Sequence, residues 1–79
     1  MRVKLRLFAT YRQFLPKETD GNSIEVEVHV GTRVSDLMSL YGIPMGADSV
    51  VLVNGITPRL NDHLEEEDVV SAFPAMAGG

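Results

Sequence analysis

Alternating apolar and polar residues open the chain. In residues 2–8 the apolar residues Val3, Leu5 and Leu7 alternate with arginine or lysine, and Phe8 follows them. This period of two predicts a half-buried β-strand with a basic outer face.

A second alternating segment, residues 24–30, has Glu25, Glu27 and His29 at its polar positions, so two acidic residues stand where the first segment has basic ones. We expect its apolar residues to face inward; they are Ile24, Val26, Val28 and Val30. An antiparallel pairing of the two strands would set opposite charges against each other on the outer face, which favours that pairing modestly.

Two segments have the apolar spacing of helices. Between the strands, apolar residues at positions 8, 11, 14 and 15 predict a short helical turn that Pro16 ends. The clearer helix covers residues 33–41, with Thr32 as the expected N-cap. Gly42 ends it, because a left-handed cap costs glycine least.

The second half of the chain predicts a hairpin. Residues 50–53 are continuously apolar, which predicts a short strand covered on both faces. Asn54-Gly55 is a strong signal for a tight turn. Residues 56–60 are expected to return as a short edge strand, because Pro58 has no backbone N–H to donate.

The last strand and a tail complete the chain. Residues 69–73 predict the final strand and Pro74 stops it, so residues 1–74 form one domain and residues 75–79 a flexible tail. The fold class is α+β, a roll in which one main helix packs across a mixed five-strand sheet. We expect the first and last strands to be central and parallel.

Composition narrows the possible functions. The chain has 79 residues, enough for one domain, and no cysteine, which excludes disulfides, cysteine nucleophiles and thiolate metal sites. A net charge of −4 disfavours nucleic acid and anionic membranes, because both are bound through Lys and Arg. No apolar run reaches the length of a membrane span and no signal peptide is evident, so we expect a cytoplasmic location.

Conventional catalytic and metal-binding motifs are not found. His29 and His63 are far apart in the sequence and are expected at the surface. The acidic run at residues 65–68 lacks the alternating spacing of a calcium loop, so we interpret it as a solvated turn and expect no metal site.

The candidate reactive site is the carboxyl-terminal pair Gly78-Gly79. It follows a strand, a proline and a short apolar spacer. From Pro74, the tail can extend about 17–20 Å. Because glycine has no Cβ, it can pass a narrow channel and let catalytic groups approach the terminal carboxylate. The tail is therefore expected to enter a partner's active site.

Motifs along the whole chain resemble those of the small β-grasp sulfur carriers, most closely the small subunit of molybdopterin synthase. The matching segments are Lys4–Thr10 with Arg12, Thr32–Leu37, Val51–Gly55, Leu64–Asp68 with Val70, and Ala72–Gly79. The Phe-Pro-x-x-x-Gly-Gly ending separates this branch from the thiamine-pathway carrier. Members of the family commonly have glycine where this chain has Glu67, so we expect either a positive φ at Glu67 or a changed turn.

The resemblance implies a ubiquitin-like fold and a non-catalytic carrier subunit of a synthase-type sulfurtransferase complex. An E1-like adenylyltransferase would use ATP and Mg²⁺ to adenylate the carboxylate of Gly79, and a sulfur donor would then replace AMP to leave a thiocarboxylate. That group would supply sulfur for molybdopterin, the molybdenum cofactor precursor, in complex with the large catalytic subunit of the synthase. No cofactor is expected to stay bound to the carrier itself.

By the same resemblance, the residues next to Gly79 dock the tail on its partners; these are Phe73, Pro74, Met76, Ala77 and the flexible Gly78. A core position is an equally good interpretation for Phe73, whereas Met76 is expected to contact a partner.

Other functions stay open at this point. A ubiquitin-like modifier, conjugated to lysine through the same glycine, would have the same fold and ending. Thiamine or tungsten-cofactor pathways could use the same tail. A plain β-grasp module that binds nucleic acid is disfavoured, because the chain is acidic and has no basic aromatic patch.

Overall fold

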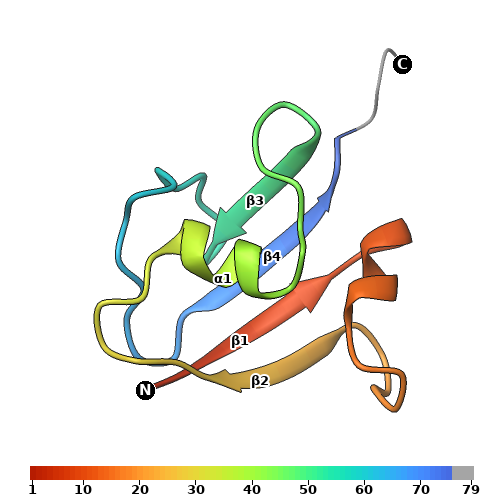
Figure 1. Cartoon of the computed structure of the whole chain (residues 1–79), viewed down its shortest axis with the longest axis horizontal. Helices are drawn as coiled ribbons and strands as arrows, with labels where there is room; N and C mark the ends of the chain where they lie inside the picture. Colours follow the sequence, from red (N-terminus) through yellow and green to blue (C-terminus); the bar gives the residue numbers. More distant parts are fainter. Residues whose placement is uncertain (76–79) are drawn as a thin grey trace.

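The chain forms one mixed β-sheet with a helix across one face (Figure 1). The structure, a computed structural model, describes residues 1–75. The elements are β1 (Arg2–Leu7), the 3₁₀-helix η1 (Ala9–Phe14), β2 (Ser23–Glu27), α1 (Val34–Leu40), β3 (Ser49–Val53) and β4 (Val69–Pro74). The sheet order is β2-β1-β4-β3, in which β1 and β4 are parallel and the outer pairs antiparallel. The β-grasp fold and the central, parallel first and last strands are thus confirmed.

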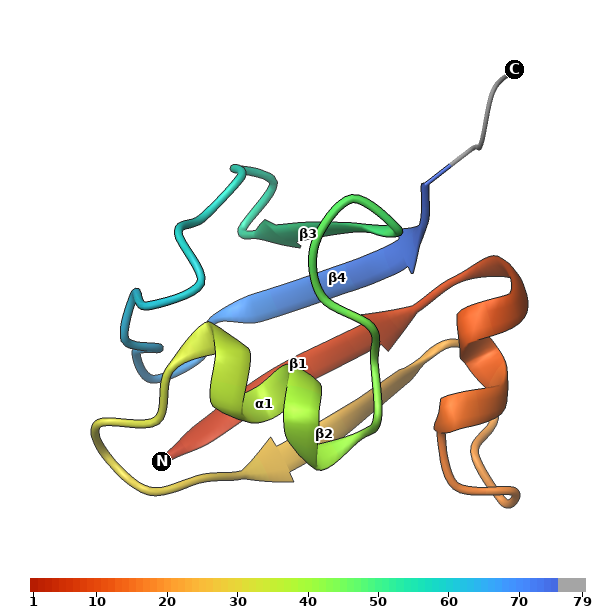
Figure 2. The same cartoon turned by 45° about the horizontal axis from the view of Figure 1, so that its top comes forward.

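The hydrophobic core lies between the sheet and α1 (Figure 2). The three apolar residues of β1 all face it and are at most 1% exposed, as their alternation predicts. From the helix, Leu37 and Met38 fill the space above the sheet and are fully buried. The other face of the sheet is uncovered, because the one helix can protect only one side.

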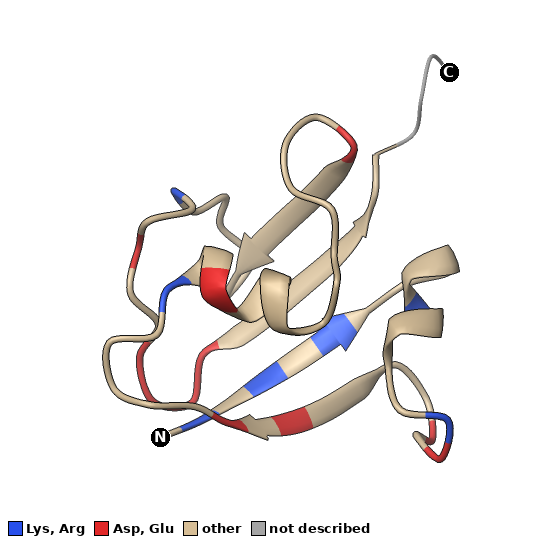
Figure 3. Ribbon diagram, viewed as in Figure 1, with Lys and Arg blue, Asp and Glu red and all other residues tan. Residues whose placement is uncertain are grey.

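On that open face, β1 is basic and β2 is acidic (Figure 3). The antiparallel register sets Arg2 opposite Glu27 and Lys4 opposite Glu25, which confirms the expected charge pairing. Arg2 Nε donates to Glu27 Oε1 at 3.0 Å. This hydrogen bond and the charge of Glu27 raise the pKa of the Arg2 guanidinium.

The inward position expected for Val30 is wrong. β2 ends at Glu27, and the chain then turns, with the Thr32 N–H donating to the His29 carbonyl at 3.1 Å. Val30 lies on this turn and is 86% exposed. Alternation alone does not reveal where pairing with β1 stops.

The expected fifth strand at residues 56–60 is also wrong; the sheet has four strands within the described residues. Asn54 and Gly55 both have positive φ and make the predicted tight turn, but only Ile56 pairs back, with Val53. Pro58 has no N–H with which to extend a ladder. The chain instead turns toward the start of α1.

The first turn of α1 explains the path of residues 56–62. It also shows that the expected N-cap, Thr32, is wrong. Arg33 is the N-cap, and its N–H donates to Asp36 Oδ2 at 2.9 Å. The next two free N–H groups of the helix donate at 3.0 Å to the carbonyls of Asp62 and Leu60. The helix start therefore holds residues 60–62 away from the edge of the sheet.

The expectation that residues 50–53 are covered on both faces is wrong for a related reason. With no fifth strand, β3 is an edge strand beside an open face, and all its residues are half-buried. Continuous apolar sequence here marks a surface that is partly open to solvent.

Glu67 takes the first of its two expected conformations, with φ of 72°. Its side chain is exposed and its N–H donates to the Arg2 carbonyl at 2.8 Å, so the turn joins the start of β4 to β1. A non-glycine residue in this region carries conformational strain.

Glu67→Gly is expected to stabilise the domain by about 0.5 kcal/mol, because relief of about 1 kcal/mol of strain exceeds the added entropy of the unfolded chain. Glu65→Gly is the matched control: it makes the same change two residues earlier, where φ is not positive, and should destabilise. Urea unfolding of both variants measures the difference. Equal destabilisation by the two would contradict this account of the turn.

Candidate functional site

The residues predicted for the reactive end lie on both sides of the limit of the described structure. Phe73 and Pro74 end β4. The remaining predicted residues, Met76, Ala77, Gly78 and Gly79, lie outside the described residues. The described part of the site is therefore the end of β4 together with Ala75.

A set of hydrogen bonds, which we call the tail anchor, fixes that place. It joins Tyr11, Asp48, Ser49 and Ala75. The Ala75 N–H donates to the Asp48 carbonyl at 2.9 Å, and Ser49 pairs with Pro74 at the end of the sheet. The Tyr11 hydroxyl lies 3.2 Å from the same carbonyl and hydrogen-bonds to the Ser49 hydroxyl.

The tail anchor holds Ala75, the last residue that the structure describes, against the loop before β3. Tyr11 belongs to η1 and is 6% exposed, so its hydroxyl needs an internal partner. The loop before β3 supplies that partner, and the same loop carbonyl holds Ala75. The sequence spacing predicts a buried Tyr11, but nothing in it identifies Asp48 or Ser49 as its partners.

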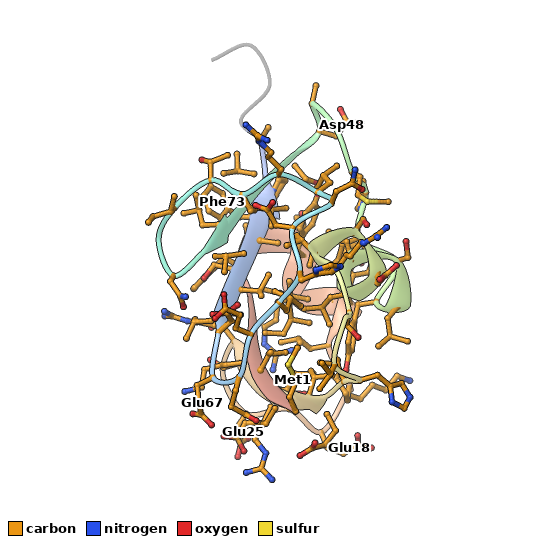
Figure 4. All side chains as sticks on the ribbon, turned by 90° about the vertical axis from the view of Figure 1, so that its left-hand side faces the viewer. Met1, Glu18, Glu25, Asp48, Glu67 and Phe73 are labelled. Atoms are coloured by element: carbon orange, nitrogen blue, oxygen red, sulfur yellow. The ribbon has the colours of Figure 1, made fainter. Side chains whose placement is uncertain are left out.

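Beside the tail anchor, the open face of the sheet carries an apolar patch. The outer apolar patch consists of Val50, Leu52 and Phe73, all half-buried. Val50 lies directly opposite Phe73 in the β3–β4 register. Phe73 is half-buried and is not part of the buried core, and it lies toward the same end of the molecule as Asp48 (Figure 4).

Basic side chains border this patch. Lys4 and Arg6 are exposed on β1, which neighbours β4. Arg6 lies over the Phe8 ring, with 5.2 Å between its guanidinium carbon and the ring centroid. A partner that covers the patch would meet an apolar centre with a cationic margin.

The acidic run at residues 65–68 is part of a hydrogen-bonded turn. Asp68 accepts the Glu65 N–H at 2.8 Å through one carboxylate oxygen and the Asn54 amide at 2.9 Å through the other. The Glu66 carboxylate accepts the Arg2 N–H at 2.9 Å. These bonds hold the loop in shape.

Within residues 1–75, no three His or acidic side chains come together as metal ligands would, and His63 accepts from Arg33 Nε at 3.4 Å. A hollow of about 520 Å³ lies between the Asn54-Gly55 hairpin and the loop around His63. No helix in this part of the chain has the length and apolar character needed to cross a bilayer.

The chain is similar to a known protein family and to several solved structures. A family model described as Mut7-C ubiquitin matches residues 1–78. Among solved structures, the Haloferax volcanii HVO 2177 protein is 29% identical with a TM-score of 0.80, over 100% of this chain and 87% of the other. A Pyrococcus furiosus protein described as molybdopterin converting factor, subunit 1, is 28% identical with a TM-score of 0.77, over 95% and 98%.

A third structure, of the modifier protein SAMP1 from Haloferax volcanii, has a TM-score of 0.78 over the full length of both chains at 20% identity, which shows the shared fold. The search of curated proteins found no match. Together the matches confirm the resemblance to ubiquitin-fold sulfur carriers. They support a carrier-like or ubiquitin-like role for this chain without distinguishing one pathway from another.

Proposed function

This chain belongs to the Mut7-C ubiquitin family, and from that membership we propose that it is a sulfur carrier that reacts through the carboxyl group of Gly79. The carboxylate attacks the α-phosphate of ATP, forming an acyl-adenylate and releasing pyrophosphate. Hydrosulfide from a sulfur donor then attacks the carbonyl carbon, AMP leaves with one of the two original carboxylate oxygens, and loss of the S–H proton gives the thiocarboxylate. The activation is needed because a carboxylate is a poor electrophile.

The observation that carries the proposal is the anchored start of the tail beside a docking surface. A hydrogen bond from its N–H to the Asp48 carbonyl holds Ala75 at the end of a central strand. The outer apolar patch lies alongside, half-buried and outside the core. A partner can therefore bind the patch from outside and receive Gly78-Gly79 in a channel, with Phe73 and Pro74 at the entrance.

The partners follow from the chemistry. An E1-like adenylyltransferase supplies the ATP and Mg²⁺ site, since the described residues hold no phosphate-binding loop or metal cluster of their own. The large subunit of a molybdopterin synthase would use the thiocarboxylate. We propose this pathway because the similar Pyrococcus protein is described as a molybdopterin converting factor subunit. A cytoplasmic setting, where ATP is available, belongs to the same proposal.

Intact-mass spectrometry tests the proposal directly. The chain is incubated with an E1-like adenylyltransferase, MgATP and a sulfur donor, and its mass is measured against a reaction without ATP. We expect an ATP-dependent shift equal to replacement of one oxygen by sulfur. Larger adducts on other proteins, with no sulfur shift, would instead indicate a ubiquitin-like modifier.

A further inference from the structure

The free edge of β2 is a surface that the carrier function does not use. β2 is the last strand of the sheet on its side. The Val28 N–H donates to Met1 and the Leu7 N–H to Asn22, so the even-numbered residues of this segment bond to β1. Because bonding direction alternates along a strand, the N–H and C=O groups of Glu25 and Glu27 are directed away from β1.

An apolar hollow continues from this edge. It has a volume of about 240 Å³ and lies between the end of β2 and α1. Val28, Leu37 and Leu40 supply its apolar lining, and Leu40 is 65% exposed. A leucine this exposed, beside unpaired strand groups, is available to another chain.

The charge around the edge is acidic. Glu25 and Glu27 project from the outer face of β2, and Asp36 is exposed at the rim of the hollow. Arg2 pairs with Glu27, whereas Glu25 makes no ion pair within residues 1–75. Pairing of two copies through β2 would bring their glutamates together, and like charges on paired strands repel.

We propose that the β2 edge binds an extended segment of a partner protein that alternates apolar and basic residues. Its backbone adds a fifth strand beside β2, through the free groups of Glu25 and Glu27. Its apolar side chains enter the hollow and contact Leu40, while its Lys or Arg side chains lie on the opposite face near the glutamates. The alternation of side chains along a strand puts both sets where they are needed.

This site is separate from the reactive end. Glu27 pairs with Arg2 at the beginning of β1, and parallel β4 ends at the other end of the sheet. Figure 4 shows Glu25 and Phe73 toward opposite ends of the molecule. The two surfaces can be occupied together, so the site would add a partner beyond those of sulfur transfer.

Titration of the ¹⁵N-labelled chain with a short peptide alternating valine and lysine tests the proposal by NMR. We expect shifts at the amides of Ser23, Glu25 and Glu27, with added protection from hydrogen exchange. A peptide alternating valine and glutamate should bind at least about tenfold more weakly.

Two matched variants locate the contact. Leu40→Ser should weaken peptide binding about tenfold. Ile56→Ser, at a similarly exposed apolar site on the hairpin (71%, against 65% for Leu40), should leave peptide binding unchanged. Shifts elsewhere, equal binding of the acidic peptide, or dimers of the peptide-free chain joined through β2 would each overturn the proposal.

Discussion

Removing Gly78 and Gly79 is expected to abolish acyl-adenylate formation while leaving the stability of the domain unchanged. The truncated chain still ends in a carboxylate, now on Ala77. That carboxylate lies about 7 Å nearer the domain when the tail is extended, and it carries a Cβ where glycine has none. Both changes keep it from an active site shaped for a longer and narrower tail.

The measurement is ATP–pyrophosphate exchange with the E1-like adenylyltransferase, together with urea unfolding of the variant. Gly79→Ala separates the two causes, because it keeps the length of the tail and adds only the Cβ. Val30→Ser is a control for surface substitution, since Val30 is 86% exposed on a turn away from the tail anchor. Exchange at the normal rate with the truncated chain would contradict Gly79 as the reacting residue.

Leu37→Ala is expected to cost about 3 kcal/mol, most of the 3–5 kcal/mol that so small a core supplies. Leu37 is fully buried between α1 and the sheet. Removing most of its side chain leaves a cavity, and a small shift of the short helix cannot close it. The melting temperature should fall by more than about 10 °C.

Leu40→Ala provides the matched comparison, because it is the same substitution in the same helix at a side chain that is 65% exposed. Its cost should stay within about 0.5 kcal/mol. Circular dichroism during thermal and urea unfolding gives both values. If the two variants lose similar stability, the packing assigned to Leu37 is incorrect.

Most of the features that could be predicted from the sequence are local, although the central, parallel placement of β1 and β4 was also predicted. Alternation alone identifies the buried face of β1. The Asn54-Gly55 pair identifies the tight turn that follows β3. The path of residues 56–60 could not be predicted, because it depends on carbonyls of Leu60 and Asp62 meeting the N–H groups at the start of α1. That contact joins segments with no shared periodicity.

The candidate site also has a part that could be predicted from the sequence and a part that could not. Phe73 and Pro74 are recognisable from the ending of the chain, and the structure places Phe73 in the outer apolar patch and Pro74 directly after it at the end of β4. The tail anchor was missed because Tyr11 and Asp48 are far apart in sequence and bond through a backbone carbonyl. Any residue type presents such a carbonyl, so no motif marks it.

The parallel neighbours β1 and β4 also give the domain a mechanical property. A partner that applies a pulling force at Ala75 pulls β4 along its own axis. β4 is hydrogen-bonded to β1 on one side and to β3 on the other. The load falls on both ladders together in shear, and no single end bond opens first as it would in a peeled hairpin. We therefore expect the domain to stay folded while a partner repeatedly binds and releases the tail.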